Sequence, residues 1–300
     1  MKENKPVPFL ASRDIPDLSG KAIFATGGNS GLGYETVKQL YAHNAKVYLA
    51  CRNEAKGKDA IARMKAELQA EGYGGGSKEK HGSVIWLKLD LCDPRKVMQV
   101  AEDFMKMEER PDVLVNNAGV TSGSYVIRPE TCNIQQAIMV NHLSPFVFTL
   151  TLLPLLIKTS QELSADVRIV NVSSSSVKSP TFEPGWLRFR NKDDFNDRHK
   201  DGRAPMRARY GVTKVANALF TLALQTRFER DGVPILAAAV DPGFVDTEGI
   251  RNVSIPSVHK AFRTIYKLVV IAFTASKEAS AQLFASTSLK DWRMSERAGV

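Results

Sequence analysis

Six short apolar runs alternate with longer helical patterns along this chain of 300 residues. Runs of this kind predict strands, and strands that alternate with helices predict βαβ units and a parallel sheet. The runs are continuously apolar rather than alternating, as expected when both faces of a sheet are buried. The predicted strands are residues 21–26, 46–51, 84–89, 112–117, 167–173 and 234–240. The predicted helices are residues 32–43, 54–71, 94–108, 133–158 and 208–230.

No linker separates two sets of such units, and the chain has no internal repeat. We therefore predict one α/β domain of the doubly wound, Rossmann type over residues 20–300. An N-terminal extension over residues 1–19 precedes it, broken by prolines and without the apolar core of a signal peptide.

The charge balance is basic, with 41 Lys and Arg against 32 Asp and Glu, a net charge of +9. It indicates either a solvated basic surface or attraction to an anionic cofactor, substrate or membrane surface. Because no finger, recognition-helix or RNA-binding motif is present, we expect no nucleic-acid partner. The longest apolar stretches, residues 146–157 and 265–275, fall short of the roughly 18–20 residues that span a bilayer, so no transmembrane segment is expected.

The three cysteines, Cys51, Cys92 and Cys132, lie far apart and form no CxxC motif. This spacing argues against a zinc site, and no metal ligands are predicted. An odd number of separate cysteines favours reduced thiols, so we expect a cytoplasmic protein.

A glycine-rich turn, TGGNSGLG at residues 26–33, links the first predicted strand to the first helix. Its glycines allow a sharp turn and close approach of a ligand, and the helix start offers free N–H groups to a pyrophosphate. It is not a P-loop, because no Gly-Lys-Ser/Thr follows. The alternative is an ordinary tight turn, but the position between strand and helix favours a dinucleotide site. The predicted contacts are Gly27, Asn29, Ser30, Gly31, Leu32 and Gly33.

The end of the second predicted strand indicates which dinucleotide binds. An Asp or Glu there would accept hydrogen bonds from the ribose hydroxyls and repel a 2′-phosphate. This chain has Cys51, Arg52 and Asn53 instead. The planar guanidinium of Arg52 suits a phosphate, so we predict NADP(H) rather than NAD(H). The alternative is that Arg52 lies in a solvated loop.

The motif YGVTK places Tyr210 and Lys214 four residues apart on a predicted helix, so both face the same way. A nearby ammonium stabilises a phenolate, so we expect the pKa of Tyr210 to be lowered toward the range of general acid–base catalysis. The alternative is a surface Tyr/Lys pair, which the glycine turn upstream disfavours.

The spacing TGxxxGxG, followed in order by NNAG, YGVTK and DPG, resembles the short-chain dehydrogenase/reductase family. The resemblance covers about residues 20–290. The stretches ACRNEAKG and VNHLSPF look most like the branch that holds retinol dehydrogenases, WW-domain oxidoreductases and fungal reductases of secondary metabolism.

The resemblance implies hydride transfer at the nicotinamide, with Tyr210 as proton donor or acceptor and Lys214 also reaching the nicotinamide ribose. Ser174, the second serine of NVSSSSVK, matches the residue that orients the substrate oxygen. Asn141 matches an asparagine that holds a water in the proton relay; alternatively, or in addition, it bridges backbone groups in a helix. The remaining implied cofactor contacts are Asp90 to the adenine, Asn117 beside the adenosine ribose and Thr247 to the carboxamide.

An insertion over residues 175–207, rich in Arg and Lys, separates Ser174 from Tyr210. It is either a solvated excursion or part of the pocket wall. Apolar residues after DPG and near residues 261–273 are expected to line the substrate pocket, with core packing as the alternative. The leading hypothesis is an NADP(H)-dependent oxidoreductase acting on a small lipophilic carbonyl or alcohol. The alternatives are a catalytically silent dinucleotide sensor and a protein that contacts a membrane surface through residues 265–275.

Overall fold

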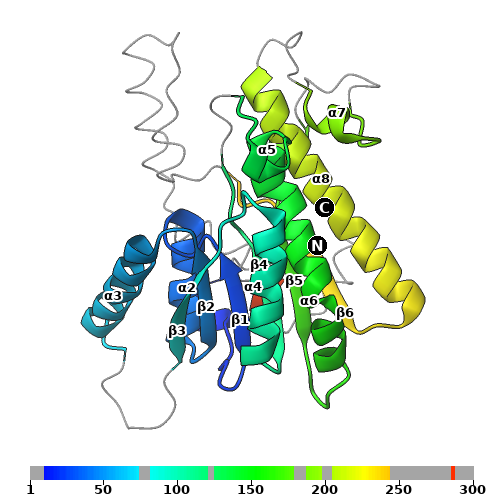
Figure 1. The fold of residues 1–300 in the computed structure, drawn as a ribbon. Coiled ribbons are helices and arrows are strands. Elements are labelled where there is room, and N and C mark those ends of the chain that lie inside the picture. Colours follow the sequence, from blue (N-terminus) through cyan, green and yellow to red (C-terminus); the bar gives the residue numbers. More distant parts are fainter. Residues whose placement is uncertain are drawn as a thin grey trace, which may run out of the picture.

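The computed structural model describes residues 10–73, 82–120, 125–178, 187–197, 205–243 and 285–287. Its centre is a parallel sheet of six strands in the order β3-β2-β1-β4-β5-β6 (Figure 1). This order reverses between β1 and β4, as in dinucleotide-binding doubly wound folds. The predicted fold class is therefore confirmed. The strands are β1 Ala22–Thr26, β2 Lys46–Cys51, β3 Ser83–Lys88, β4 Pro111–Asn116, β5 Val167–Val172 and β6 Ile235–Val240.

Helices cover both faces of the sheet (Figure 1). The longer ones are α2 Gly31–Ala42, α3 Glu54–Ala70, α4 Pro94–Met107, α6 Ser144–Ser160 and α8 Pro205–Asp231. The shorter ones are α1 Ala11–Asp14, α5 Gln136–Ile138, α7 Lys192–Phe195, the 3-10 turns η1 Pro129–Thr131 and η3 Ser175–Lys178, and the π-turn η2 Met139–Leu143.

Alternate residues of the strands form two hydrophobic cores, one on each face of the sheet. In the first core Ile23 and Val47 pack against α2 and α3. In the second, the neighbouring residues Phe24 and Tyr48 pack against α4, α6 and α8. The period of two in strands and the apolar residues at nearly every strand position produce this two-sided burial.

Strands β3 and β6 both depart from the predicted two-sided burial: β6 has three buried residues of six, and β3 has none. Strand β3 lies at an edge of the sheet, and its residues are exposed or partly buried, with Ile85 38% exposed. An edge strand has a neighbour on one side only, so its apolar run is covered less completely.

The helix predicted over residues 133–158 begins later and is interrupted. Helix α5 starts at Gln136, and the π-turn η2 separates it from α6. Gln135 caps α5, because its side chain accepts a hydrogen bond from the N–H of Ile138. The interruption places Asn141 inside the π-turn rather than in a regular helix.

Part of the predicted N-terminal extension packs on the domain. Ile15 and Leu18 are buried in the first core, and the N–H of Leu18 bonds to the carbonyl of His43. Residues 10–19 therefore contribute to the folded unit.

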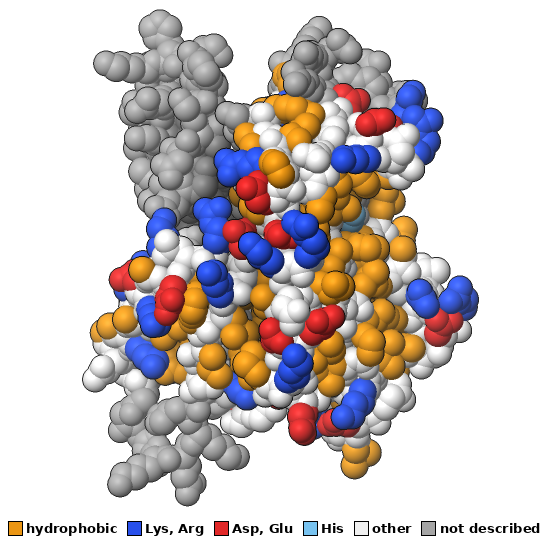
Figure 2. Space-filling view, viewed as in Figure 1, with side chains coloured by type: hydrophobic (Ala, Val, Ile, Leu, Met, Phe, Trp, Pro, Cys, Tyr) orange, Lys and Arg blue, Asp and Glu red, His pale blue; other side chains and the backbone are white. Residues whose placement is uncertain are grey.

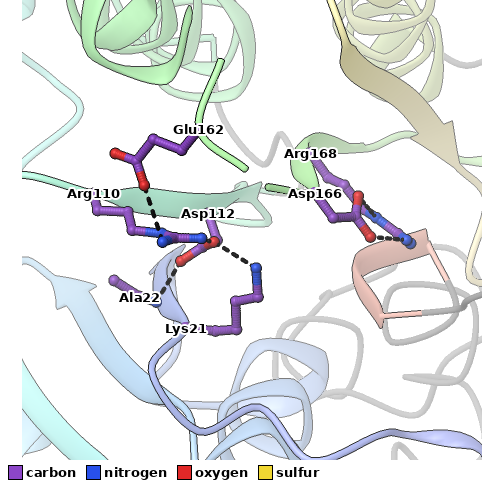
Figure 3. A network of polar contacts seen from close by, with 7 residues as sticks. All are labelled: Lys21, Ala22, Arg110, Asp112, Glu162, Asp166 and Arg168. Carbon is purple, nitrogen blue, oxygen red and sulfur yellow. Dashed lines mark hydrogen bonds and ion pairs between the residues drawn. The ribbon is translucent and has the colours of Figure 1, made fainter. Parts of the chain in front are cut away.

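Figure 3 shows the polar contacts at the amino ends of β1, β4 and β5, the edge of the sheet opposite the residues predicted for catalysis. The fully buried carboxylate of Asp112 accepts hydrogen bonds from Lys21 Nζ at 2.8 Å and from the N–H of Ala22 at 2.9 Å. Nearby, Arg168 pairs with Asp166 and donates to the carbonyl of Ala285, which ties residues 285–287 to β5. These contacts hold strand ends together.

Residues 187–197 of the predicted insertion dock on the domain. Phe189 and Phe195 pack against a small cluster that includes Val212 of α8. The side chain of Asn196 accepts a hydrogen bond from the N–H of Gln135 and donates to the carbonyl of Asn133. This part of the insertion is thus held against the domain, although most of its residues are exposed and none of them lines the cavity described below.

Hydrophobic side chains gather over α6 and α8 on the face shown in Figure 2. Leu150 of α6 and Leu219 and Leu222 of α8 are 39%, 50% and 63% exposed. Within the described residues, one helical stretch, Gln136–Ser160, is long and apolar enough to cross a membrane, with a mean hydropathy of 1.6. Half of its apolar window is buried in the protein, as in a core helix, and we assign it to the second core.

Candidate active site

A cavity of about 550 Å³ opens at the carboxyl ends of the strands. This edge, next to the reversal of strand order between β1 and β4, is where ligands bind in open α/β sheets. The cavity brings together predicted residues from distant parts of the chain. Those that line it are Gly27, Asn29, Ser30, Gly31, Leu32, Arg52, Asp90, Asn117, Ser174, Tyr210 and Lys214.

The glycine turn has no space for side chains at three of its positions, Gly27, Gly28 and Gly33. Gly27 has a φ of +68°, and a Cβ on it would lie 2.9 Å from the Cα of Ala118. A Cβ on Gly33 would lie 2.3 Å from the carbonyl oxygen of Gly27, so Gly33 lets α2 pack directly on the turn. Ser30 precedes α2 without making a side-chain cap, so its side chain does not occupy the free N–H groups of the first helical turn.

Thr26 and Asn117 hold the turn against the end of β4. The hydroxyl of Thr26 accepts hydrogen bonds from the N–H groups of Asn117 and Ala118, at 3.0 and 2.9 Å. Asn117 Nδ2 donates to the carbonyl of Thr26 at 2.9 Å. The structure therefore gives Asn117 a framework role, and its contact with the ribose stays a prediction. Sequence reasoning assigned no role to Thr26, whose side chain is 1% exposed.

Arg52 and Asp90 lie at the end of the cavity formed by β2 and β3. Arg52 is exposed and forms no hydrogen bond or ion pair with any residue that the structure describes, so its guanidinium is available to a ligand. Asp90 is partly fixed, because its carboxylate accepts a 3.0 Å hydrogen bond from the N–H of Cys92. Cys51 is 7% exposed, and its thiol bonds to the carbonyl of Asn53.

Lys214 and Tyr210 lie one turn apart on α8. Lys214 is 3% exposed, and its Nζ donates a 2.8 Å hydrogen bond to the carbonyl of Val172 at the end of β5. The same nitrogen lies 5.5 Å from the centre of the Tyr210 ring. Burial disfavours the ammonium and lowers the pKa of Lys214 to about 8.

The predicted lowering of the Tyr210 pKa is wrong for this structure. Burial raises the pKa of Tyr210 above its ordinary value; the hydrogen bond with Ser174 opposes the rise, and the negative charge of Asp241 adds to it. The Lys214 ammonium donates its hydrogen bond to the carbonyl of Val172 and not to Tyr210, so it does not offset these effects. Tyr210 is therefore a neutral phenol at pH 7, the form that can give up a proton.

The four serines after β5 have different surroundings. Ser174 lines the cavity together with Ser173 and Ser176, and it is the one of the four serines whose interaction with Tyr210 opposes the rise in the tyrosine pKa. Its hydroxyl donates to Ser176 Oγ at 3.1 Å. Ser173 is 7% exposed and donates to the carbonyl of Lys214 at 3.2 Å. Ser175 is exposed and outside the cavity. This arrangement favours Ser174 as the residue that orients a substrate oxygen.

Asn141 lies behind the cavity wall, 1% exposed in the π-turn η2. Its Oδ1 accepts a 2.7 Å hydrogen bond from the N–H of Val120, and its Nδ2 donates to Val120 O at 3.0 Å and to Thr213 Oγ1 at 3.2 Å. The bridging role that the sequence left open is thus confirmed, and the water-holding role stays a prediction. Thr247 and residues 261–275 lie outside the described part of the chain.

The family model described as short chain dehydrogenase matches residues 21–184, more than half of the chain. The chain belongs to the short-chain dehydrogenase/reductase family. The family predicted from the motifs is thereby confirmed, and the chain is an oxidoreductase by family.

Two relatives are themselves named short-chain dehydrogenase/reductases. One, from Colletotrichum higginsianum, is 38% identical over 92% of this chain and 66% of its own length. Another, from Pyricularia grisea, is 34% identical over 79% of this chain and 98% of its own length. These matches cover most of the chain.

Solved structures share the fold. A Mycobacterium paratuberculosis protein is 26% identical, with a TM-score of 0.63 over 95% of this chain and 82% of its own. The Pseudomonas aeruginosa RhlG/NADP active-site complex is 20% identical, with a TM-score of 0.63 over 91% of both chains.

Proposed function

We propose that this chain is an NADP(H)-dependent reductase or dehydrogenase that acts on a small lipophilic carbonyl or alcohol. The observation that carries this proposal is one cavity with a dinucleotide-binding turn at one end and Ser174, Tyr210 and Lys214 at the other. A role in secondary metabolism, in the cytoplasm, is part of the same proposal.

The residues around the cavity fit a dinucleotide phosphate. The backbone of the turn is open to close approach, because Gly27 and residues 29–32 line the cavity; Gly33 does not line it and packs against the turn instead. The first turn of α2 is left uncapped by Ser30 and presents the positive end of its dipole. Arg52, without a partner in the described structure, supplies a planar cation where a 2′-phosphate is expected. A relative in fold was solved with NADP in its active site.

The bound nicotinamide would supply or accept the hydride. The rest of the chemistry belongs to side chains of this chain. Tyr210 gives its phenolic proton to the carbonyl oxygen during reduction and takes it back in oxidation, a contribution worth roughly 10²–10⁴ in rate. Ser174 donates to the same oxygen and orients it. Lys214, buried beside the Tyr210 ring, supplies positive charge below its pKa of about 8.

Oxidation of NADPH with a panel of carbonyls tests the proposal. We expect a higher kcat/KM for bulky hydrophobic carbonyls than for small sugars or hydroxy acids. NADPH binding without turnover on any carbonyl or alcohol would instead identify a dinucleotide sensor. Flotation with liposomes tests the membrane-surface alternative, whose segment at residues 265–275 lies outside the described residues.

A further inference from the structure

The π-turn Met139–Leu143 carries two side chains that the chemistry above does not use fully, Asn141 and His142. A π-turn bonds each N–H to the carbonyl five residues earlier, as Ser144 does with Met139 here. Such turns open the helical ladder and recur at functional sites.

Asn217 of α8 holds the backbone of the π-turn. Its Nδ2 donates a 3.0 Å hydrogen bond to the carbonyl of Asn141, and its side chain is buried, at 7% exposure. Asn217 lies three residues after Lys214 and seven after Tyr210, so all three share one face of α8. The face of α8 that carries Tyr210 and Lys214 thus also binds the π-turn, through Asn217.

His142 fixes the orientation of that amide. A carbonyl can only accept, so the NH₂ group of Asn217 faces Asn141 and its Oδ1 faces His142. His142 Nδ1 lies 3.0 Å from Oδ1 and must therefore carry the proton. Burial lowers the pKa of His142, against the Asn217 hydrogen bond, so the ring is neutral at pH 7. The geometry selects the Nδ1–H tautomer.

The backbone of Asn217 is tied to the sheet through a second pair of bonds. Thr221 Oγ1 donates to the carbonyl of Asn217 at 2.8 Å, and Asn171 Nδ2 of β5 donates to the same hydroxyl at 2.9 Å. A residue anchored at both its backbone and its side chain has little freedom to move. Asn217 is therefore suited to transmit a fixed position from the sheet to the π-turn.

The π-turn borders Lys214. A Cβ on Gly119 would lie 3.4 Å from Asn141 Oδ1 and 3.9 Å from Lys214 Nζ, so both polar groups flank the same point. The Asn141 side chain also bonds to Thr213, the residue before Lys214. A shift of the π-turn would therefore change the polar surroundings of the Lys214 ammonium.

Resting on the proposed function, we propose that His142 and Asn217 are positioning residues for proton transfer. The imidazole N–H orients the Asn217 amide, and that amide holds the Asn141 carbonyl. We call these two hydrogen bonds, from His142 to Asn217 and from Asn217 to Asn141, the clasp. The clasp keeps the Asn141 side chain between Val120 and Thr213, beside Lys214.

Two variants break the clasp, and two others control for it. Asn217→Asp loses the donor to Asn141, and His142→Phe loses the donor to Asn217 while keeping a ring next to Phe146 and Phe220. For both we expect kcat to fall by about 10-fold to 100-fold, as for a small misplacement of catalytic groups, with KM for the carbonyl changed less than about twofold.

His142→Asn places an amide donor near the original Nδ1 and should restore most of kcat. Ser160→Ala, at the far end of α6, removes a buried hydroxyl that donates to the carbonyl of Ile157 and has no part in the clasp, so it should lower the melting temperature and leave kcat unchanged. Unchanged kcat in His142→Phe, or an equal loss in Ser160→Ala, would contradict the positioning role. If Asn217→Asp does not fold, the kcat values of His142→Phe and His142→Asn still test whether the donor at position 142 positions the catalytic groups.

The tautomer is tested without turnover. Nitrogen-15 spectra of the imidazoles, with His142→Asn to assign one signal among the 5 histidines, should show His142 as neutral Nδ1–H. An Nε2–H or charged ring at pH 7 would overturn the clasp. If the protein reduces no carbonyl, the proposed function fails, while this spectrum still decides whether the clasp exists.

Discussion

Lys214 and Val172 are joined by a 2.8 Å hydrogen bond from the ammonium to the last carbonyl of β5. A second bond runs the other way, from the hydroxyl of Ser173 to the carbonyl of Lys214, at 3.2 Å. Together they lock α8 onto the end of β5, next to Ser174. These two bonds help to bring Ser174 into one cavity with Tyr210 and Lys214, although the insertion separates Ser174 from the other two in the sequence.

Lys214→Met should stabilise the folded protein at pH 7. On folding, the pKa of Lys214 falls from 10.5 to about 8, because burying the charge costs free energy. This cost lowers the stability of the fold by its full amount below pH 8 and disappears as the pH rises from 8 to 10.5. The shift corresponds to roughly 3 kcal/mol. We expect urea unfolding to show the variant more stable than the wild type at pH 7, with the gap closing toward pH 10.5. A gap that does not depend on pH would rule out a desolvated ammonium.

Tyr210→Phe should abolish turnover and leave NADPH binding near normal, because only the phenolic hydroxyl is lost. We expect kcat to fall by at least about 10²-fold, the lower range for a general acid. Single-turnover assays and a fluorescence titration of NADPH measure the two effects separately. Retention of more than about a tenth of kcat would exclude Tyr210 as the acid.

Ser174→Ala should be the most damaging of the serine variants for turnover, since Ser174 lines the cavity and its interaction with Tyr210 acts on the pKa of the tyrosine. Ser173→Ala should chiefly lower stability, because its buried hydroxyl bonds to the backbone of Lys214. Ser175→Ala serves as the matched control, as this residue is exposed and outside the cavity. If Ser175→Ala lost as much kcat as Ser174→Ala, Ser174 could not be assigned as the residue that orients the substrate oxygen.

The fold was predictable because the secondary structure that the local sequence patterns favour is also the one that the packed sheet and helices require. The apolar runs became strands within a residue or two, and the glycine turn joins β1 to α2 as predicted. The failures have physical reasons. The exposure of β3 follows from its position at an edge of the sheet, and the sequence does not reveal which strand lies there. The π-turn has no period of its own to detect, so residues 133–158 resemble one helix.

The electrostatics of the site could not be read from spacing alone. The four-residue separation of Tyr210 and Lys214 shows that they share a face, but not that Val172 takes the ammonium's hydrogen bond. Burial, which sets both pKa shifts, depends on the packing of α8 on β5. The Asn217–Asn141 bond is likewise invisible in the sequence, because it joins two asparagines from different helical elements.

Asp112→Ala should destabilise the protein without affecting the cavity. The carboxylate is fully buried and holds Lys21 and the N–H of Ala22 at the opposite end of the sheet (Figure 3). Its removal leaves the buried N–H of Ala22 without its acceptor, which costs about 1–3 kcal/mol, whereas the 27% exposed side chain of Lys21 can regain water. Asp103→Ala, which breaks an exposed pair with Lys106, should cost no more than about 1 kcal/mol. Thermal and urea unfolding compare the two, and equal losses would show that burial does not set the difference.

Arg52→Ala should weaken NADPH binding and leave NADH binding nearly unchanged. Arg52 is exposed at the cavity, has no partner among the described residues, and presents a fork of donors that matches a phosphate. Losing hydrogen bonds to a charged group costs about 1.5–3 kcal/mol, or roughly 10-fold to 150-fold in Kd. Cys51→Asp should shift preference toward NADH by repelling the 2′-phosphate, at some cost in stability because Cys51 is 7% exposed.

Titration of both cofactors into the wild type, Arg52→Ala and Lys56→Ala decides the assignment. Lys56 lies four residues further on, in the first turn of α3, is exposed and does not line the cavity, so it controls for the loss of one positive charge near the site. If long-range attraction alone favours NADPH, both variants should lose affinity to the same small extent, and the loss should vanish in salt. If Arg52 holds the 2′-phosphate, only Arg52→Ala should lose the discrimination between the two cofactors. Equal affinity of the wild type for NADPH and NADH would exclude the predicted cofactor preference.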